Sequence, residues 1–431
     1  MIQDNNSNLI YSSPEFERDL DRYAEVIVKI GLNLQPGQRL LIGGPTAYTY
    51  GTPIELAPLV RLITKKAYQR GARFVEVFWD DDQLRKIRFE HAPRDSFEEY
   101  PTWRTDCQYK FGIEGDAVLI FAAFNPNLLK DQDQDLMATT FNSYVKHRKT
   151  FGDLITKSAV NWTAITAPID GWTEKVFPNV EQENKKVKFW DTIFEICRVK
   201  CEDPIANWED HINQLSARNK YLNQKRYVSV KFDGPGTDLT IGLPKGHIWG
   251  SARFKTQSGI DFVGNIPTEE VFTTTHKDKT EGVVSATKPR HTDVIIDGIS
   301  LIFSKGCVIE ATAKKGEEML HKILETDEGA KRLGEVALVP HSSPISQSGL
   351  LYYNTLIDEN ASSHIAIGRG FKFALKDGSI MSDKEFSKAG GNISKIHIDF
   401  MIGSEKMNVD GITKNGKTEP IMRKGEWTFE I

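Results

Sequence analysis

The segment KIHIDFMI, residues 395–402, carries the clearest chemical pattern in the sequence. Side chains at positions i and i+2 of a β-strand lie on the same face, so we expect His397 and Asp399 to project together while the apolar residues beside them fill a core. An imidazole and a carboxylate held side by side on a rigid strand can bind a metal ion. A hydrogen-bonded His–Asp pair on a solvent-facing strand has the same pattern, so these two residues alone leave both interpretations open.

Three further residues of metal-binding type lie next to apolar segments in the same half of the chain. His364 ends a segment rich in acidic and small residues, whereas Glu270 and Glu335 adjoin strand-like runs. Taken singly, each fits equally a structural histidine or a surface carboxylate. Together with His397 and Asp399 they are sufficient to hold two divalent ions, and paired ions about 3.5–4 Å apart can generate hydroxide near neutral pH and stabilise a hydrolytic transition state.

Other catalytic patterns are poorer. The sequence has no GxSxG nucleophile motif and no HExxH helix. The glycines of residues 234–236 lack the strand–GxGxxG–helix context of a dinucleotide site. The four cysteines are scattered, and Cys197 and Cys201 have no second pair to complete a zinc site, so we expect reduced thiols in a cytoplasmic protein.

Composition narrows the class of protein. The chain has 431 residues, which suits two domains, and its 39% hydrophobic and 26% charged residues exclude wholesale disorder. A net charge of −4 argues against a nucleic-acid partner. The longest apolar run, residues 117–124, is under half of the roughly 20 residues that span a bilayer. The first residues lack the pattern of a secretory signal, so no membrane partner is expected.

The N-terminal half alternates helical and strand patterns. Ser13 and Pro14 are typical of a helix start, apolar residues recur on one helical face as far as Ile30, and Gly31 is expected to end the helix. Strand, helix and strand in this order imply a right-handed crossover and a parallel sheet. The predicted strands are residues 39–42, 74–79, 117–121 and 162–166, and the second helix is residues 53–70.

The character of the sequence changes after a charged helical stretch at residues 187–222. Short strands and turns follow, with a strand expected at residues 237–243 and a helix at residues 315–333. We place the boundary between an N-terminal domain of residues 1–215 and a C-terminal domain of residues 216–431. The predicted fold class is α/β: an N-terminal parallel-sheet α/β domain plus a C-terminal β-rich α+β domain that carries the metal site.

Nearly the whole chain resembles the thermophilic-type metalloaminopeptidase family, which includes aminopeptidase T, aminopeptidase S and PepS. Several long blocks in the right order carry the resemblance. These blocks are residues 31–38 (GLNLQPGQ), 67–72 (AYQRGA), 236–244, 265–273 (NIPTEEVFT), 327–330 (DEGA), 333–340, 343–346 (SPIS), 354–364 and 397–403.

The resemblance implies a homodimer that removes N-terminal amino acids from peptides. It also implies a dinuclear metal centre in the C-terminal domain, with Co²⁺, Zn²⁺ or Mg²⁺ supporting activity. Carried over by motif, the metal ligands fall on the five residues already singled out. These are Glu270, Glu335, His364, His397 and Asp399.

The sequence departs from the family pattern near the expected site. The family has a tyrosine seven residues after the first ligand histidine, where this chain has Phe371, and a phenyl ring can neither coordinate a metal nor donate a hydrogen bond. Thr275 stands where the family usually has proline, and Arg290–His291 replaces an apolar segment. Tyr352 or Tyr353 could supply a substitute hydroxyl.

Four functions remain open at this point. The first is a dinuclear-metal aminopeptidase, in which Glu359 is a candidate to move the proton from water to the leaving amine. The second is the same scaffold redirected to a specialised or biosynthetic amide reaction, because Phe371 and the cations Arg290, Arg369 and Lys372 would suit an acidic or modified substrate. The others are a mononuclear iron enzyme, like the dihydroxypyridine dioxygenases that look like distant relatives, and a non-catalytic binding protein.

Overall fold

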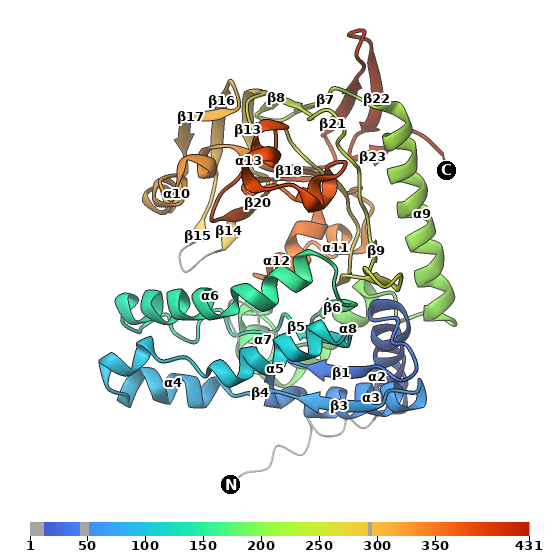
Figure 1. The fold of residues 1–431 in the computed structure, drawn as a ribbon, viewed down its shortest axis with the longest axis vertical. Coiled ribbons are helices and arrows are strands. Elements are labelled where there is room, and N and C mark those ends of the chain that lie inside the picture. The colour runs from blue at the N-terminus through green and yellow to red at the C-terminus, as the bar shows by residue number, and fades with distance from the viewer. Residues whose placement is uncertain (1–12, 44–50, 292–294, 431) are drawn as a thin grey trace. The chain divides into compact units, whose positions relative to one another are not determined.

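The computed structural model describes residues 13–43, 51–291 and 295–430. The chain divides into two compact units (Figure 1). The first unit comprises Met1–Asp210 and Arg253–Pro267, and the second comprises His211–Ala252 and Thr268–Ile431. The division falls within helix α9 (Pro204–Lys225).

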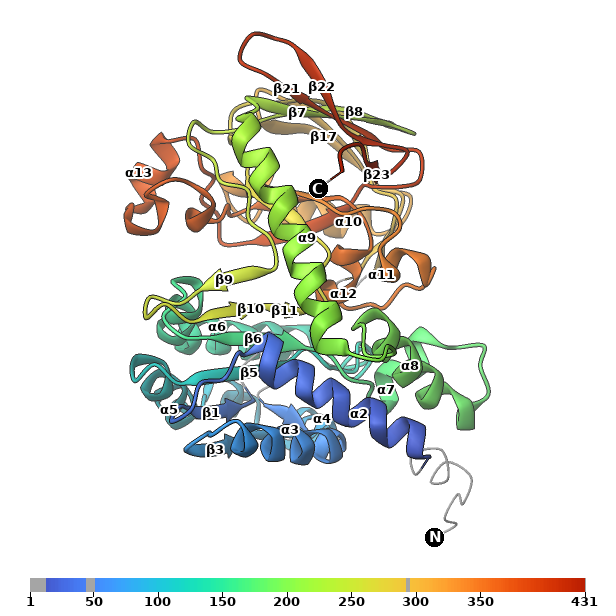
Figure 2. The same cartoon turned by 90° about the vertical axis from the view of Figure 1, so that its right-hand side faces the viewer.

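The first unit is built on a five-stranded sheet in which every neighbouring pair is parallel, as predicted for the N-terminal half. Strand β5 is buried along its whole length, which is typical of a parallel strand covered on both faces. Figure 2 shows the strands of this sheet in turn. In sheet order they are β11 (Asn265–Ile266), β6 (Trp162–Ile165), β5 (Ala117–Phe121), β1 (Arg39–Ile42) and β3 (Phe74–Val77).

Helices and two small pairs of strands complete the first unit. The helices are α2 (Pro14–Val26), α3 (Ala57–Gln69), α4 (Asp82–His91), α5 (Thr102–Ile113), α6 (Gln134–Thr156), α7 (Asp170–Val176) and α8 (Gln182–Ile196). The pairs are β2 (Thr52–Pro53) with β4 (Trp79–Asp80), and β9 (Arg253–Lys255) with β10 (Asp261–Val263). Short helical turns are η1 (Ile27–Gly31), η2 (Ile54–Leu56) and η3 (Arg94–Glu98).

The first helix begins where the sequence predicts. The hydroxyl of Ser13 accepts a hydrogen bond from the backbone N–H of Phe16 at 3.1 Å, and Pro14 occupies the first turn. The regular α-helix ends earlier than expected, because residues from Ile27 to Gly31 form a turn of π-helix. The helical segment as a whole therefore ends at the predicted glycine.

The second unit contains two antiparallel sheets. The larger has eight strands: β17 (Cys307–Thr312), β16 (Ser300–Ser304), β13 (Thr280–Ser285), β8 (Thr237–Gly242), β7 (Ser229–Gly234), β21 (Asn408–Ile412), β22 (Thr418–Arg423) and β23 (Glu426–Trp427). The smaller has four: β12 (Val271–Thr274), β18 (Leu333–Leu338), β19 (His364–Gly368) and β20 (His397–Met401). The strand predicted from residue 237 is confirmed as β8.

The remaining elements of the second unit are short. They are the hairpin β14 (Arg290–His291) and β15 (Ile295–Ile296), helices α10 (Glu317–Leu324), α11 (Pro344–Gln347), α12 (Thr355–Asp358) and α13 (Asp383–Lys388), and turns η4 (Glu328–Lys331), η5 (Glu359–Ala361), η6 (Lys372–Ala374) and η7 (Gly378–Ile380).

The four-stranded sheet owes its rigidity to burial and to a buried amide. All six residues of β18 and all five of β19 are buried. On one face, Val336, Ile365 and Phe400 lie directly opposite one another on adjacent strands and pack as apolar neighbours. The side-chain amide of Asn392 donates hydrogen bonds to the carbonyl oxygens of Gly368 (2.6 Å) and Arg332 (3.2 Å), which holds β19 to the loop before β18.

Two predicted helices differ from the structure. The helix expected at residues 315–333 ends at Leu324, because the carboxylate of Asp327 accepts the backbone N–H groups of Ala330 and Lys395 and so fixes a 3₁₀ turn instead. The charged stretch at residues 187–222 belongs to two helices, α8 and α9. Arg198 adopts a left-handed conformation between them, and Pro204 begins the second.

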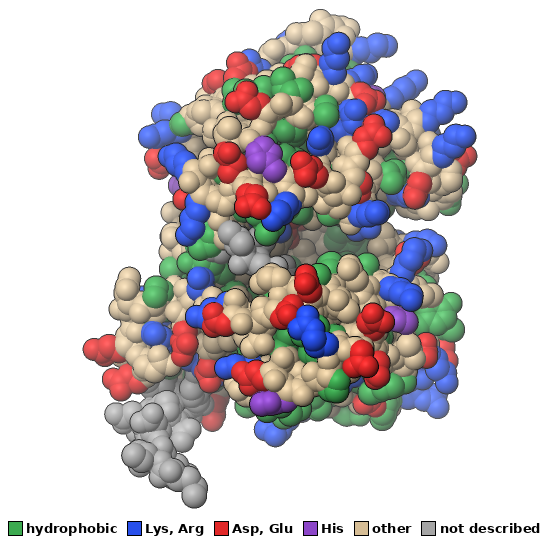
Figure 3. All heavy atoms as spheres, turned by 90° about the vertical axis from the view of Figure 1, so that its left-hand side faces the viewer, with side chains coloured by type: hydrophobic (Ala, Val, Ile, Leu, Met, Phe, Trp, Pro, Cys, Tyr) green, Lys and Arg blue, Asp and Glu red, His purple; other side chains and the backbone are tan. Residues whose placement is uncertain are grey.

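Among the described residues, no helix is both long and apolar enough to cross a bilayer. On the face shown in Figure 3, Lys and Arg side chains are interspersed with Asp and Glu side chains on each unit. This mixture of charges on the face shown is in keeping with a net charge of −4.

Candidate metal centre

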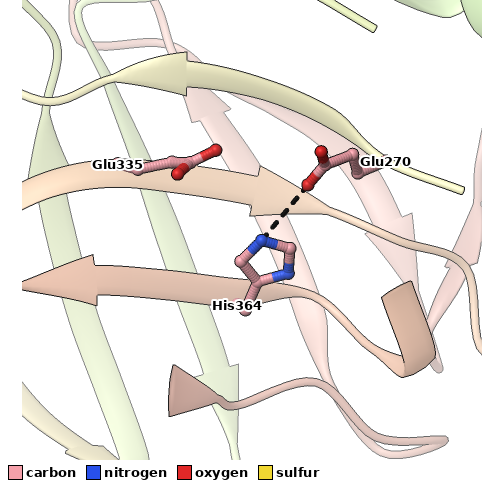
Figure 4. A group of neighbouring side chains, drawn as sticks. All are labelled: Glu270, Glu335 and His364. Atoms are coloured by element: carbon pink, nitrogen blue, oxygen red, sulfur yellow. Dashed lines mark ion pairs between the residues drawn. The ribbon is translucent and has the colours of Figure 1, made fainter. Parts of the chain in front are cut away.

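Two overlapping groups of metal-binding side chains meet at Glu335. Glu270, Glu335 and His364 each offer one ligand atom within 4.8 Å of the others, and so do Glu335, His397 and Asp399. Figure 4 shows the first group: the carboxylates of Glu335 and Glu270 lie above the imidazole of His364, which forms an ion pair with Glu270. The five residues that the sequence predicted therefore lie in one cluster, with Glu335 common to both groups.

The register of the four-stranded sheet brings four of these residues to one face. Glu335 of β18 lies opposite Ala366 of β19, which lies opposite Asp399 of β20. His364 is two residues before Ala366, and His397 is two residues before Asp399, so all four side chains project from the same face. Ala366 lies between Glu335 and Asp399 across the strands, and because its side chain is only a methyl group it does not separate the two carboxylates.

Glu270 reaches the same cluster from the residue before β12. Strand β12 pairs with β18, placing Thr274 opposite Glu335. The backbone N–H of the preceding residue, Glu269, donates to the side-chain oxygen of buried Asn360 at 2.7 Å, and the Asn360 amide donates to the carbonyl of Leu356. Asn360 thus holds the segment carrying Glu270 against the turn that carries Glu359. The sequence analysis missed this role, and the Asp–Glu–Asn run at residues 358–360 was its only signal.

Hydrogen bonds to backbone carbonyls orient both imidazoles. Nδ1 of His364 lies 3.1 Å from the carbonyl oxygen of Ser362, and Nδ1 of His397 lies 2.7 Å from that of Arg369. Because a carbonyl oxygen only accepts, Nδ1 carries the proton in each ring. The Nε2 atoms therefore face carboxylates: His364 to Glu270 at 3.2 Å, and His397 to Glu335 at 3.0 Å and Asp399 at 3.4 Å. A metal-binding histidine is typically oriented in this way.

Opposite charges at close range shift the pKa values of these groups. Burial would lower the pKa of His364, but the hydrogen bond and charge of Glu270 outweigh it and raise the pKa to about 10. Burial likewise opposes protonation of His397, and the charge of Asp399 raises its pKa well above the ordinary value. Burial would raise the pKa of Asp399, but the charge of His397 holds it below the usual range. Burial raises the pKa of Glu335.

The donor set fits divalent metal ions. Imidazole nitrogens together with carboxylates suit Zn²⁺ and Co²⁺, and the three carboxylates alone suit Mg²⁺. Four of the five residues sit on adjacent strands rather than on loops. The protons on His364 and His397 occupy the positions between nitrogen and carboxylate that metal cations would take.

We expect metal affinity to rise steeply with pH, because a bound ion must displace these protons. His364 keeps its proton up to a pKa of about 10 without metal, so its deprotonated fraction increases about tenfold for each pH unit between pH 7 and 9. The association constant for Co²⁺ should increase by at least that factor, as measured by competition with a chelator of known pH dependence. The variant His321→Gln, at an exposed position of α10, should keep the same slope. An affinity that is constant over this range would contradict the proton-displacement account.

Glu359 lies outside both three-residue groups but is close enough to interact with them. It begins the turn η5, directly after α12. Burial, together with the negative charges of Asp399 and Glu270, raises its pKa well above the ordinary value. A buried carboxyl group with a raised pKa is a common type of proton-transfer group, and Glu359 remains a candidate for that role.

Phe371 packs directly on a residue of the cluster. Its ring centroid lies 4.8 Å from that of His397, and it stacks on Phe373 at 5.1 Å. Phe272 of β12 meets both rings edge-on. The position where the family has a tyrosine is thus part of an aromatic wall. The suggested substitute, Tyr352, is fully buried and its hydroxyl bonds the hydroxyl of Ser348 at 2.9 Å, away from this role.

The sequence also contains a match to the phosphate-binding-loop motif, and this match lies outside the metal centre. Residues 411–418 read GITKNGKT, which matches the spacing of a phosphate-binding loop. In the structure these residues form the end of β21, a turn and the start of β22. A phosphate-binding loop needs a strand followed by a helix whose N-terminus faces the phosphate, and a β-hairpin lacks that helix.

Comparisons with known proteins identify the family of the chain. The model of the thermophilic metalloprotease family (M29) matches residues 16–427. Aminopeptidase 2 of Geobacillus stearothermophilus is 43% identical over 417 residues, and aminopeptidase AmpS of Bacillus subtilis (strain 168) is 42% identical over 415. Each alignment covers 96% of this chain and 99% of the relative.

Solved structures give the same result for the fold. Wild-type AmpT from Thermus thermophilus matches with a TM-score of 0.90 at 38% identity, covering 96% of this chain and 100% of that one. A 2,5-dihydroxypyridine dioxygenase from Pseudomonas putida KT2440 matches with a TM-score of 0.50 at 10% identity, a likeness that concerns the fold alone. With the family model spanning nearly the whole chain, the chain belongs to the thermophilic metalloprotease family, M29.

Proposed function

We propose that this protein is a metal-dependent aminopeptidase that removes the N-terminal residue of peptides and holds two divalent ions. One observation carries the proposal: the register of β18, β19 and β20 directs Glu335, His364, His397 and Asp399 to one face, where Glu270 joins them. The relatives named aminopeptidases, at 37–43% identity, support the reaction.

Each group of three residues would hold one ion, and Glu335 would serve both. The ions would be Zn²⁺, Co²⁺ or Mg²⁺: imidazole together with carboxylate suits Zn²⁺ and Co²⁺, whereas Mg²⁺ would be held mainly by the carboxylate oxygens. When bound, such a pair supplies an activated water and polarises the scissile carbonyl.

The residues around the ligands perform the remaining tasks. Glu359 would take a proton from the attacking water and return it to the leaving amine, because bound cations would offset the negative charges of Asp399 and Glu270 that raise its pKa and would leave it as a carboxylate. The carbonyl groups of Ser362 and Arg369 keep both imidazoles turned toward the centre. The rings of Phe371 and Phe373 would exclude water from the side of His397.

Three further properties belong to the same proposal. We propose that residues 216–431 are the catalytic domain, since all five ligands lie in the second unit. We propose a homodimer, because the first unit exposes large apolar side chains such as Trp103 (59% exposed) and Ile113 (57%). We propose a cytoplasmic location, because the four cysteines, all within the described part of the chain, are present as thiols.

Metal removal tests the reaction. EDTA followed by desalting should abolish hydrolysis of leucine p-nitroanilide, and Co²⁺ or Zn²⁺ should restore it, because the ligands alone cannot activate water at neutral pH. Protein desalted without chelator is the control. Full hydrolysis by metal-free protein, verified by elemental analysis, would refute a metal-dependent reaction.

One observation favours a second candidate, a specialised amide reaction on the same scaffold. Phe371 lies against His397, and its ring offers no hydroxyl to a reacting oxygen. The metal-restored protein distinguishes the aminopeptidase from the specialised amide reaction. Two bound metals per chain without cleavage of any unmodified peptide or aminoacyl anilide would favour the specialised reaction.

A further inference from the structure

Two cationic side chains beside the metal centre have no part in the mechanism proposed above. Lys288 and Arg290 lie on the segment that follows β13. This segment is held to the end of β20, because Thr287 donates its backbone N–H to the carbonyl of Met401 at 2.8 Å and its hydroxyl to the carbonyl of Gly403 at 2.9 Å. The backbone of this segment therefore starts beside the end of the strand that carries His397 and Asp399, and Arg290 reaches that strand at Asp399.

Arg290 is close to a ligand of the centre but is weakly bonded. Its Nη1 lies 3.4 Å from the carbonyl oxygen of Asp399 and 3.4 Å from the hydroxyl of Thr355, both long for hydrogen bonds. Its Nε is buried and has no hydrogen-bond partner among the described residues. A guanidinium is a planar fork of five donors, and among the described residues only Nη1 of Arg290 has hydrogen-bond partners.

Lys288, like Arg290, is partly buried and has no ion pair with a described residue. Its side chain is partly buried, and burial lowers the pKa of its ammonium group. Asp358 is the acidic group whose charge acts on it, and the same carboxylate also interacts with Arg290. Within the described ranges, neither cation has a carboxylate at ion-pair distance.

Asp358 is not within ion-pair distance of either cation, and each of its oxygens accepts a backbone N–H instead. One accepts the backbone N–H of Tyr352 at 2.8 Å, and the other accepts that of Asn354 at 2.9 Å. Loading the centre would not supply the missing charge either. Its three acidic ligands carry −3 and two divalent ions would carry +4, and an ionised Glu359 would bring the total only to zero, so the loaded cluster would offer no net negative charge.

Other cations near the cluster differ from these two. Lys372 donates to the carboxylate of Asp383 at 2.7 Å and to the carbonyl of Met381 at 2.8 Å, so its charge is paired on the surface. Arg369 is exposed, and its carbonyl rather than its guanidinium serves His397. Lys288 and Arg290 are therefore the pair positioned to receive an anion next to the ligands.

We propose that Lys288 and Arg290 form an anion-binding subsite beside the metal centre that takes a carboxylate of the substrate. The inference rests on the proposed aminopeptidase function and specifies its substrate class. The carboxylate has two sources: the acidic side chain of an N-terminal residue, or the C-terminus of a dipeptide. Either would form charge-assisted hydrogen bonds with donors that are already partly desolvated.

Matched pairs of ligands that cannot be cleaved separate binding from turnover. L-Glutamate against L-glutamine tests the side-chain source. A leucyl-glycine analogue with a reduced, methyleneamino bond against its C-terminal amide tests the C-terminal source. Calorimetry on zinc-loaded protein should give at least about tenfold tighter binding for the carboxylate member of one pair, because a charge-assisted hydrogen bond contributes that much.

Substitutions assign the preference to the two cations. Lys288→Met and Arg290→Met should each reduce the ratio between the two members of that pair to about twofold or less, since each removes one of the two charges. Lys384→Met removes the same charge from an exposed position of α13 and should keep the wild-type ratio. Elemental analysis should give the same zinc content in all four proteins.

The results distinguish failure of the subsite from failure of the proposed reaction. Equal affinities within both pairs in the wild-type protein would overturn the subsite, even if aminoacyl anilides are hydrolysed. So would a carboxylate preference that persists in both cation variants. A preference that depends on Lys288 and Arg290 in a protein that hydrolyses no peptide would support the subsite and refute the aminopeptidase.

Discussion

Replacing Glu335 by glutamine is expected to reduce kcat/KM at least about a thousandfold and to release bound metal, because this carboxylate is the member common to both ligand groups. Glutamine preserves the volume of the side chain but offers a neutral amide, which is a poor ligand. Loss of about 4 kcal/mol of transition-state stabilisation corresponds to this factor. The measurements are steady-state kinetics and metal content by elemental analysis.

A matched variant separates this effect from a general loss of charge. Glu310→Gln makes the same change at an exposed position of β17 in the same unit and should leave both kinetics and metal content at wild-type levels. Two bound metals and undiminished turnover in Glu335→Gln would mean that the two groups do not share this ligand. If Glu335→Gln lost one ion and kept partial activity, Glu335 would belong to one ligand group alone, which would contradict its shared role.

The part of the site that the sequence could predict is the part set by local geometry. His397 and Asp399 share a face because side chains of a strand alternate, and this needs no knowledge of the rest of the fold. The helix start at Ser13 and Pro14, and the buried strand β5, follow in the same way from short-range patterns. Glu270, Glu335 and His364 were found only by counting residue types and by resemblance to a family.

The rest depends on contacts between segments distant in sequence. That Glu335 faces Asp399 across Ala366 follows from the pairing of β18, β19 and β20, and register between strands some 30 residues apart is set by the whole sheet. A shift of one residue in either pairing would turn half of the cluster to the opposite face. No single-strand pattern contains that information.

The same reasoning explains the elements that were missed. Strand β11 is two residues long and pairs with β6, about 100 residues earlier, so it has no periodicity to detect. The predicted helix at residues 315–333 ends early because Asp327 bonds Lys395, a partner distant in the sequence. Lys288 was likewise not predicted as a binding residue. Its partial burial, and the hydrogen bonds of Asp358 to backbone N–H groups, are visible only in the folded chain.

Replacing Glu359 by glutamine is expected to lower kcat about 10²- to 10⁴-fold while both metals stay bound, because this is the usual contribution of a positioned proton-transfer group. Glutamine keeps the shape of the side chain but cannot accept a proton from water. The pKa of Glu359 is raised by burial and by the charges of Asp399 and Glu270, and bound cations would offset those charges, leaving a carboxylate able to act as a base near neutral pH.

Lost turnover together with retained metal in Glu359→Gln would assign proton transfer, and not metal binding, to Glu359. A ligand variant such as Glu335→Gln loses both, whereas Glu310→Gln loses neither, so the three variants together separate ligand, proton carrier and bystander. The acidic limb of the pH–kcat profile provides a second test. If Glu359 is the base, its protonation lowers kcat at acidic pH in the wild-type protein, and that limb should disappear from the residual activity of Glu359→Gln. An unchanged limb in the variant would assign the titration to another group and remove Glu359 from the mechanism.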